Sequence, residues 1–168
     1  MRAREPVIAY LGLGSSLGDR AAHLRFALTR LEELPRQTSG DRPASMKASP
    51  PAAWRKNPFL NSVVEIETAL APADLLREIH QIEKDAGRVR AVHGEDRTLD
   101  IDILLYGDRV IRDGGLQIPH PRLHERRFVL APLADLAPDL VIPGLLRPVA
   151  ELLRRVPGDA SPFQTTLP

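Results

Sequence analysis

The stretch from Arg97 to Asp108, RTLDIDILLYGD, places two aspartates inside an otherwise apolar run. Side chains alternate between the two faces of a strand, so Asp100 and Asp102 are expected on the same face. At the usual rise per residue their Cα atoms would lie roughly 6.5 Å apart. Two like charges this close repel each other unless a positive group lies between them. The opposite face, expected to point into the core, carries Leu99, Ile101, Ile103 and Leu105.

The composition around this stretch is that of a soluble globular protein. The chain has 168 residues, of which 43% are hydrophobic and 27% charged, and this predicts one domain with a real core, residues 1–168. Residues 157–168 are expected to form a loose C-terminal tail. A net charge of +1 gives no reason to expect a nucleic acid or an anionic membrane as a partner. The chain has no cysteine, which excludes disulfides and thiolate metal sites.

The first residues, MRAREPVIAYLGLGSS, contain an apolar run too short for a signal peptide or a membrane span. A cytoplasmic location is therefore expected.

Hydrophobic periodicity predicts alternating strands and helices along the chain. Strands are expected at 7–13 and 59–70, near 44–49, from 97 to 106, and at 110–111 as a short return strand. Helices are expected at 20–34, capped by Asp19, and at 74–86, with Pro72 in the first turn, and further helices near 126–136 and 148–155. This order predicts an α+β fold, a ferredoxin-like split β-α-β sandwich in which helices pack on a mainly antiparallel sheet.

Three kinds of site could explain two carboxylates on one strand face. They could bind Mg²⁺, act as an acid/base pair as in glycosidases, or pair with arginines on a solvated face. Arginines precede the strand and also follow His120, and a glycosidase would not need them. The combination favours a polyphosphate carried with its Mg²⁺. The six arginines are Arg88, Arg90, Arg97, Arg122, Arg126 and Arg127.

Other short motifs in the chain fit known sites poorly. Gly12-x-Gly14-x-x-x-Gly18 has neither the spacing of a dinucleotide-binding fold nor the end of a P-loop, so Gly14 to Gly18 is interpreted as a strand-to-helix turn. His120 and His124 have the i, i+4 spacing of zinc ligands on a helix. The prolines on both sides of His120 argue against a helix there, and no third ligand is evident.

Five segments together resemble the 6-hydroxymethyl-7,8-dihydropterin pyrophosphokinase family. The resemblance covers residues 7 to 155 and implies transfer of pyrophosphate from ATP to the pterin's hydroxymethyl group, giving the pterin diphosphate and AMP, in folate biosynthesis. It also implies two Mg²⁺ ions and a monomer. The matching segments are YLGLGSSLGDR (10–20), FLNSVVEIET (59–68), IEKDAGRVR (82–90), RTLDIDILLYGD (97–108) and PHPRLHERRFVLAPLADLAPDL (119–140).

The resemblance also implies roles for individual residues. Asp100 and Asp102 would hold the metals and, with Arg90 and Arg97, form the catalytic set. The positions implied to contact ATP are His80, Glu83, Arg90, Arg97, Ile103, His120 and Arg126. The positions implied to contact the pterin are Ser49, Pro50, Phe59, Asn61 and Phe128.

Two segments depart from the family pattern. Residues 91–96, AVHGED, bring acidic residues close to an ATP site, and residues 44–54, ASMKASPPAAW, lack the family's Tyr-x-Thr-x-Pro pattern. These departures leave open an alternative, a catalytically weakened relative that binds nucleotide or pterin. A nucleic-acid-binding module is disfavoured, because aromatic residues make up only 4% of the chain.

Overall fold

The computed structural model describes residues 4–34, 45–54, 57–87, 98–158 and 163–164. Its main sheet contains β1 (Val7–Ser15), β2 (Met46–Ala48), β3 (Ala52–Trp54), β4 (Asn57–Thr68), β5 (Asp100–Tyr106) and β10 (Phe163–Gln164). The helices are α1 (Arg20–Glu32), α2 (Pro72–Asp85), α3 (Arg127–Leu136) and α4 (Val149–Arg155). Four short strands, β6 (Ile111–Asp113), β7 (Leu116–Ile118), β8 (Val141–Ile142) and β9 (Arg147–Pro148), and the 3₁₀ turn Leu123–Glu125 complete the described elements.

The long strand β1 lies between β4 and β5, and β5 forms one edge of the sheet. The strand order is β10-β3-β4-β1-β5, with β2 also paired to β4, and every described pair is antiparallel. Helix α2 connects β4 to β5, so these two strands flank β1 and run parallel to each other. This is the split β-α-β arrangement, and the predicted α+β fold with a mainly antiparallel sheet is confirmed.

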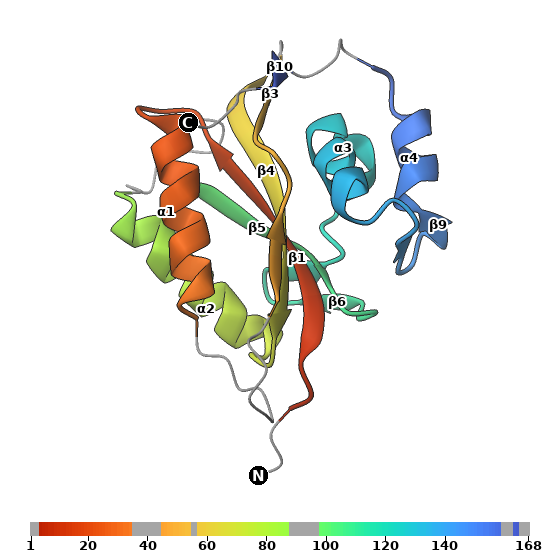
Figure 1. Cartoon of the computed structure of the whole chain (residues 1–168). Helices are drawn as coiled ribbons and strands as arrows, with labels where there is room; N and C mark the ends of the chain where they lie inside the picture. The colour runs from red at the N-terminus through yellow and green to blue at the C-terminus, as the bar shows by residue number, and fades with distance from the viewer. Residues whose placement is uncertain (1–3, 35–44, 55–56, 88–97, 159–162, 165–168) are drawn as a thin grey trace.

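Helices cover both faces of the sheet. Figure 1 shows α1 and α2 packed on one face and α3 and α4 on the other. The first face is closed by a core that includes Leu24 of α1 and Ile79 of α2, both almost fully buried. The second face is closed by a smaller core around Leu130 and Leu133 of α3 and Val149 of α4.

Local sequence signals explain where the first two helices begin. The Asp19 carboxylate accepts a hydrogen bond from the Ala22 N–H at 3.0 Å, which satisfies one of the free donors of the first turn of α1. Pro72 opens α2, where its fixed φ suits the first turn and its missing N–H is not needed. Gly87 follows α2 with φ of +84°, a conformation that glycine adopts without strain.

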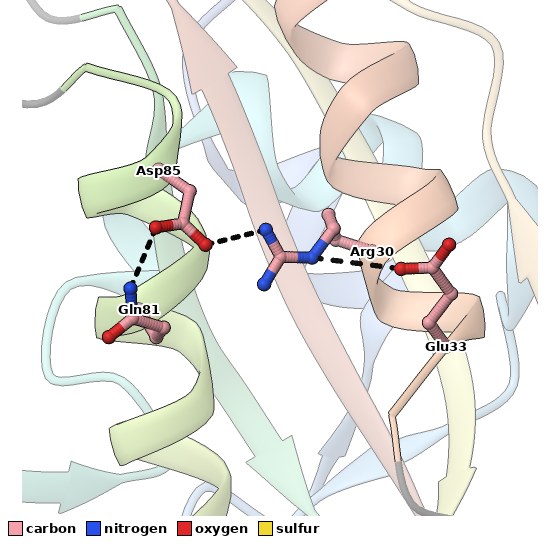
Figure 2. Close-up of polar contacts among 4 residues, drawn as sticks. All are labelled: Arg30, Glu33, Gln81 and Asp85. Carbon is pink, nitrogen blue, oxygen red and sulfur yellow. Dashed lines mark hydrogen bonds and ion pairs between the residues drawn. The ribbon is translucent and has the colours of Figure 1, made fainter.

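A polar bridge joins the two helices on the first face, as Figure 2 shows. Arg30 of α1 donates to the Asp85 carboxylate of α2 at 2.6 Å, and Gln81 donates to the other carboxylate oxygen at 2.7 Å. These hydrogen bonds, first that from Arg30 and then that from Gln81, hold the pKa of Asp85 below its usual value. The bridge ties the C-terminal end of α2 to α1, and α2 carries two of the residues implied to contact ATP.

The structure corrects the expected face of Leu105. Leu11 pairs with Ile103 but Tyr10 pairs with Leu105, so Leu104 is an extra residue in β5, a β-bulge. A bulge interrupts the alternation of side chains, and Leu105 joins Leu104 in the core beneath α3. The prediction that Leu105 shares the face of Ile101 and Ile103 was therefore wrong.

Three further elements differ from the expectation. The segment after Gly107 does not return along β5, because β6 pairs with β7 in a separate two-stranded sheet. The expected loop between α1 and β4 contains β3 as well as β2. No alternation of hydrophobic residues predicts β3. Within the C-terminal residues, Phe163–Gln164 pair with β3 as β10.

Candidate active site

The aspartate pair lies where two cavities meet. Asp100 and Asp102 are half-buried on β5, opposite Gly14 and Gly12 of β1 respectively. Both carboxylates line a first cavity of about 320 Å³, on the face of the sheet that carries α3. Both also line a second cavity of about 410 Å³, bordered by α2 and β7. The two acids can therefore contact two ligands at once, one from each cavity.

Aromatic side chains from two different elements line the first cavity. Phe59 comes from β4 and Phe128 from the first turn of α3, so a flat ligand can contact both. Asn61, two residues after Phe59 on β4, is 7% exposed and also lines the cavity. Its amide nitrogen donates to the Phe59 carbonyl at 3.1 Å, which fixes the orientation of the amide. Alternation along β4 brings both side chains to the same face, as the sequence predicts.

Arg126 also lines the first cavity, directly before α3. Its guanidinium carbon lies 5.7 Å from the centroid of the Phe128 ring, within the range of a cation–π contact. Positive charge is thereby placed beside the aromatic wall, in the cavity that Asp100 and Asp102 share.

The second cavity collects most of the residues implied to contact ATP. His80 and Glu83 reach it from α2, one turn apart, and Ile103 reaches it from β5. Glu83 is 2% exposed, which is rare for a carboxylate and typical of one held by specific contacts. The complete lining is Leu76, His80, Glu83, Asp100, Ile101, Asp102, Ile103, Gly115, Leu116, Gln117, His120 and Pro121.

His120 presents a neutral imidazole to the second cavity. Burial lowers its pKa below the usual 6.5, Arg126 and Arg122 lower this pKa further, and only Asp100 acts in the opposite direction. Its Nδ1 accepts a hydrogen bond from the Arg122 N–H at 3.2 Å. In a neutral ring this leaves the proton on Nε2, so Nε2 is the donor that His120 can offer to a ligand.

Not every residue implied by the resemblance reaches a cavity. Ser49 is 3% exposed, its hydroxyl accepts the Val63 N–H at 2.9 Å, and its carbonyl accepts the Ser62 hydroxyl at 2.8 Å. These bonds hold the chain after β2 against β4, and neither Ser49 nor Pro50 lines either cavity. Arg90 and Arg97 lie outside the described residues.

His120 and His124 do not come together with a third potential metal ligand among the described residues. His124 is exposed within the short 3₁₀ turn, and its Nε2 lies 3.8 Å from a Glu125 carboxylate oxygen. No group of three or more potential His, Cys, Asp or Glu ligands occurs among the residues that the structure places. Over the same residues, no helix is long and apolar enough to cross a membrane.

Two sets of lining residues were missed from the sequence. Gly12 and Gly14 line the first cavity as part of strand β1; the sequence predicted the strand at Gly12 but a turn from Gly14 onward, and it assigned neither glycine to a site. The signal was present, because glycines two apart inside a strand share one face. Leu116 and Gln117 of β7 line the second cavity, but nothing in the local sequence predicts that β7 approaches β5.

The structure thus defines a class of protein, a mainly antiparallel α+β fold with a carboxylate pair that lines two cavities. Comparison with known proteins narrows this class. Residues 10–138 match the family described as 7,8-dihydro-6-hydroxymethylpterin-pyrophosphokinase (HPPK), and this match covers most of the chain. The chain belongs to this family and is an ATP-dependent pyrophosphokinase of folate biosynthesis.

Named relatives agree with this assignment. The chain is 39% identical over 137 residues to the 2-amino-4-hydroxy-6-hydroxymethyldihydropteridine pyrophosphokinase of Haemophilus influenzae, covering 82% of this chain and 86% of the relative. It is 43% identical over 129 residues to the protein of the same name from Bacillus subtilis, covering 77% of each chain. It is also 39% identical over 152 residues to the folic acid synthesis protein fol1 of Schizosaccharomyces pombe, covering 90% of this chain but 21% of that longer protein. None of these findings favours a catalytically weakened relative.

Proposed function

We propose that the first cavity binds the reduced pterin, that the second binds ATP, and that Asp100 and Asp102 hold Mg²⁺ where the two substrates meet. The observation that carries this assignment is that both carboxylates line both cavities. A group transferred between substrates must pass through a point that both can reach. The aspartate pair occupies such a point.

The pterin assignment rests on the shape and chemistry of the first cavity. Phe59 and Phe128 offer aromatic faces to a flat heterocycle, and ring stacking contributes beyond the area buried. Asn61 adds an amide whose nitrogen is already bonded to the Phe59 carbonyl, so its Oδ1 is suited to accept from the edge of the ring system. This arrangement orients a pterin as well as binding it.

The ATP assignment rests on the second cavity. His120 offers an Nε2–H donor to a phosphate or sugar oxygen, while Glu83 and His80 stand one turn apart on α2. Arg126 lies on the pterin side of the aspartates and is placed to interact with phosphate oxygens that reach the junction. The roles of Arg90 and Arg97 toward the phosphates are carried over from the family resemblance.

The aspartates suit Mg²⁺ as a donor set. Mg²⁺ prefers oxygen ligands and binds through one or two carboxylates together with substrate phosphates. Two carboxylates two residues apart on a strand, facing the proposed phosphate site, match that requirement. When bound, Mg²⁺ neutralises phosphate charge and orients the β-phosphorus for attack. The family resemblance supports two such ions.

The reaction follows from this placement. The pterin hydroxyl oxygen forms a bond to the β-phosphorus of ATP, and the bond from that phosphorus to the oxygen bridging to the α-phosphate breaks. AMP leaves with that oxygen, and the hydroxyl loses its proton. Phe59, Phe128 and Asn61 orient the nucleophile, while His120 and Arg126 hold oxygens of the nucleotide.

The proposal also bears on assembly and location. The family resemblance implies a monomer. An enzyme that takes ATP and a reduced pterin is expected to act in the cytoplasm, without nucleic acid or a membrane as a partner.

The test measures AMP formed from ATP and 6-hydroxymethyl-7,8-dihydropterin with Mg²⁺, for the wild type and for Asp100→Ala. Asp108→Ala is the matched control, because Asp108 is exposed and lines neither cavity. We expect AMP only when the pterin is present, wild-type rates for the control, and no significant rate for Asp100→Ala. AMP formation that ignores the pterin or the loss of Asp100 would contradict the assignment.

A further inference from the structure

The floor of the first cavity is a stretch of strand without side chains. Gly12 and Gly14 of β1 both line the cavity. Across the sheet, Gly14 lies between Asn61 of β4 and Asp100 of β5, while Gly12 lies between Val63 and Asp102. Asn61 and Asp100 are thus separated by two strand spacings, about 10 Å. The backbone of Gly14, without a side chain, therefore lies between Asn61, proposed to bind the edge of the ring, and Asp100, proposed to act in the transfer.

At Gly14 the absence of a side chain is required by space. A Cβ added there would lie 3.1 Å from Cδ1 of Phe59 and 3.2 Å from Oδ1 of Asn61, closer than ordinary van der Waals contact. The φ of Gly14 is not positive, so the backbone conformation itself would admit alanine. Gly12 is different, because its nearest neighbour would be Cδ2 of Leu104 at 3.4 Å, the end of a flexible side chain.

Hydrogen bonds hold the backbone that carries the two groups that would collide with such a Cβ. The Asn61 amide donates to the Phe59 carbonyl at 3.1 Å, so a shift of one disturbs the other. Arg20 of α1 donates to the Pro58 carbonyl at 3.0 Å, which holds the backbone just before Phe59. A Cβ at Gly14 would therefore displace Phe59 and Asn61 together by a few tenths of an ångström.

We propose that Gly14 is the positioning residue of the ring-binding cavity. Its bare Cα lets Phe59 and Asn61 pack against β1 in the arrangement that receives a flat two-ring heterocycle. This inference rests on the proposed function, since it takes the first cavity as the pterin site. A Cβ at Gly14 would meet Phe59 and Asn61, which line the first cavity and not the second, so a change there acts mainly on the ring substrate.

The test compares Gly14→Ala with Gly12→Ala, the same substitution on the same face of the same strand. For Gly14→Ala we expect the KM for the pterin to rise about tenfold, because small misplacements of positioning groups weaken binding strongly. The KM for ATP and the kcat at saturating pterin should stay within about twofold of the wild type, and Gly12→Ala should raise the pterin KM far less. A pterin KM within twofold of the wild type in Gly14→Ala, or an equal rise in both KM values, would overturn the inference.

A measurement on the wild type keeps the inference testable even if Gly14→Ala does not fold. The Hα resonances of Gly14 are followed by NMR during titration with the pterin, and separately with AMP. Ring currents of a heterocycle lying on the floor should shift these resonances with the pterin but hardly with AMP. Unshifted Gly14 resonances in a protein that binds the pterin would refute the inference that the ring lies against Gly14. A wild type that binds no pterin would refute the proposed function instead.

Discussion

Replacing Asp102 with asparagine is the most direct test of the aspartate pair between the two cavities, because the change removes one charge and keeps the size of the side chain. Asp102 is half-buried and lines both cavities, and the proposed Mg²⁺ site has only two carboxylates among the described residues. If the pair exists for catalysis, Asp102→Asn should abolish turnover and leave the fold intact. If the pair is structural, the same change should cost stability.

The expected magnitudes separate these outcomes. If the two carboxylates are as far apart as Cα atoms two positions apart on a strand, roughly 6.5 Å, they repel by about 2.5 kcal/mol at an effective dielectric constant of about 20 and by about 0.6 kcal/mol in water. Since both are half-exposed, this repulsion amounts to roughly 1 kcal/mol, and the free energy of unfolding of Asp102→Asn should stay within about 1 kcal/mol of the wild-type value. The loss of a charged group from the transferring centre should lower kcat about a thousandfold or more, roughly 4 kcal/mol of transition-state stabilisation.

Urea unfolding followed by circular dichroism measures the first quantity, and AMP release measured at saturating ATP and pterin gives the second. Asp108→Asn serves as the control for an isosteric loss of charge on an exposed aspartate. A kcat above one-tenth of the wild-type value would refute the assignment of Asp102. A loss of more than about 2 kcal/mol of unfolding free energy would show instead that the carboxylate holds the sheet edge together.

Three further predictions follow from the same geometry. Phe128→Ala should weaken pterin binding about tenfold in calorimetry and leave ATP binding nearly unchanged, because a stacked aromatic contact contributes about 1 kcal/mol or more; equal loss of both would indicate general distortion. NMR titration of the ligand-free protein should give His120 a pKa below 6.5. The unfolded state then binds this proton more readily, so the contribution of His120 to stability falls as the pH drops below about 6.5. A pKa at or above 6.5 would contradict the burial of the ring. Ile79→Ala should cost about 2–5 kcal/mol in urea unfolding, because Ile79 is fully buried between α2 and the sheet, and a loss below about 1 kcal/mol would contradict that packing.

The parts of the fold that the sequence predicted are those set by local periodicity. Alternation through β4 brings Phe59 and Asn61 to one face, and the cap at Asp19 starts α1. Each of these features depends on residues within a few positions of one another. The same local logic placed Asp100 and Asp102 side by side on β5.

The parts that the sequence did not predict depend on distant partners. The short strands β3 and β7 have no periodicity of their own and exist because β4 and β6 offer them hydrogen-bonding edges. Ser49 is implied by the resemblance to contact the pterin, and the sheet also uses its hydroxyl to accept the Val63 N–H. A polar residue in an unpatterned segment can serve either purpose, and only tertiary pairing decides between them.

The bulge at Leu104 links these observations to the active site. The Leu104 carbonyl accepts the His120 N–H at 2.9 Å, so the extra residue of β5 anchors the segment that brings the imidazole to the second cavity. The Leu104 side chain is the nearest neighbour of a Cβ added at Gly12, on the floor of the first cavity. Bulges re-aim side chains beside active sites, and this one breaks an alternation that the sequence alone would have continued. The bulge that contradicts the prediction for Leu105 thus also places Leu104 in the lining of the first cavity and anchors His120 beside the second.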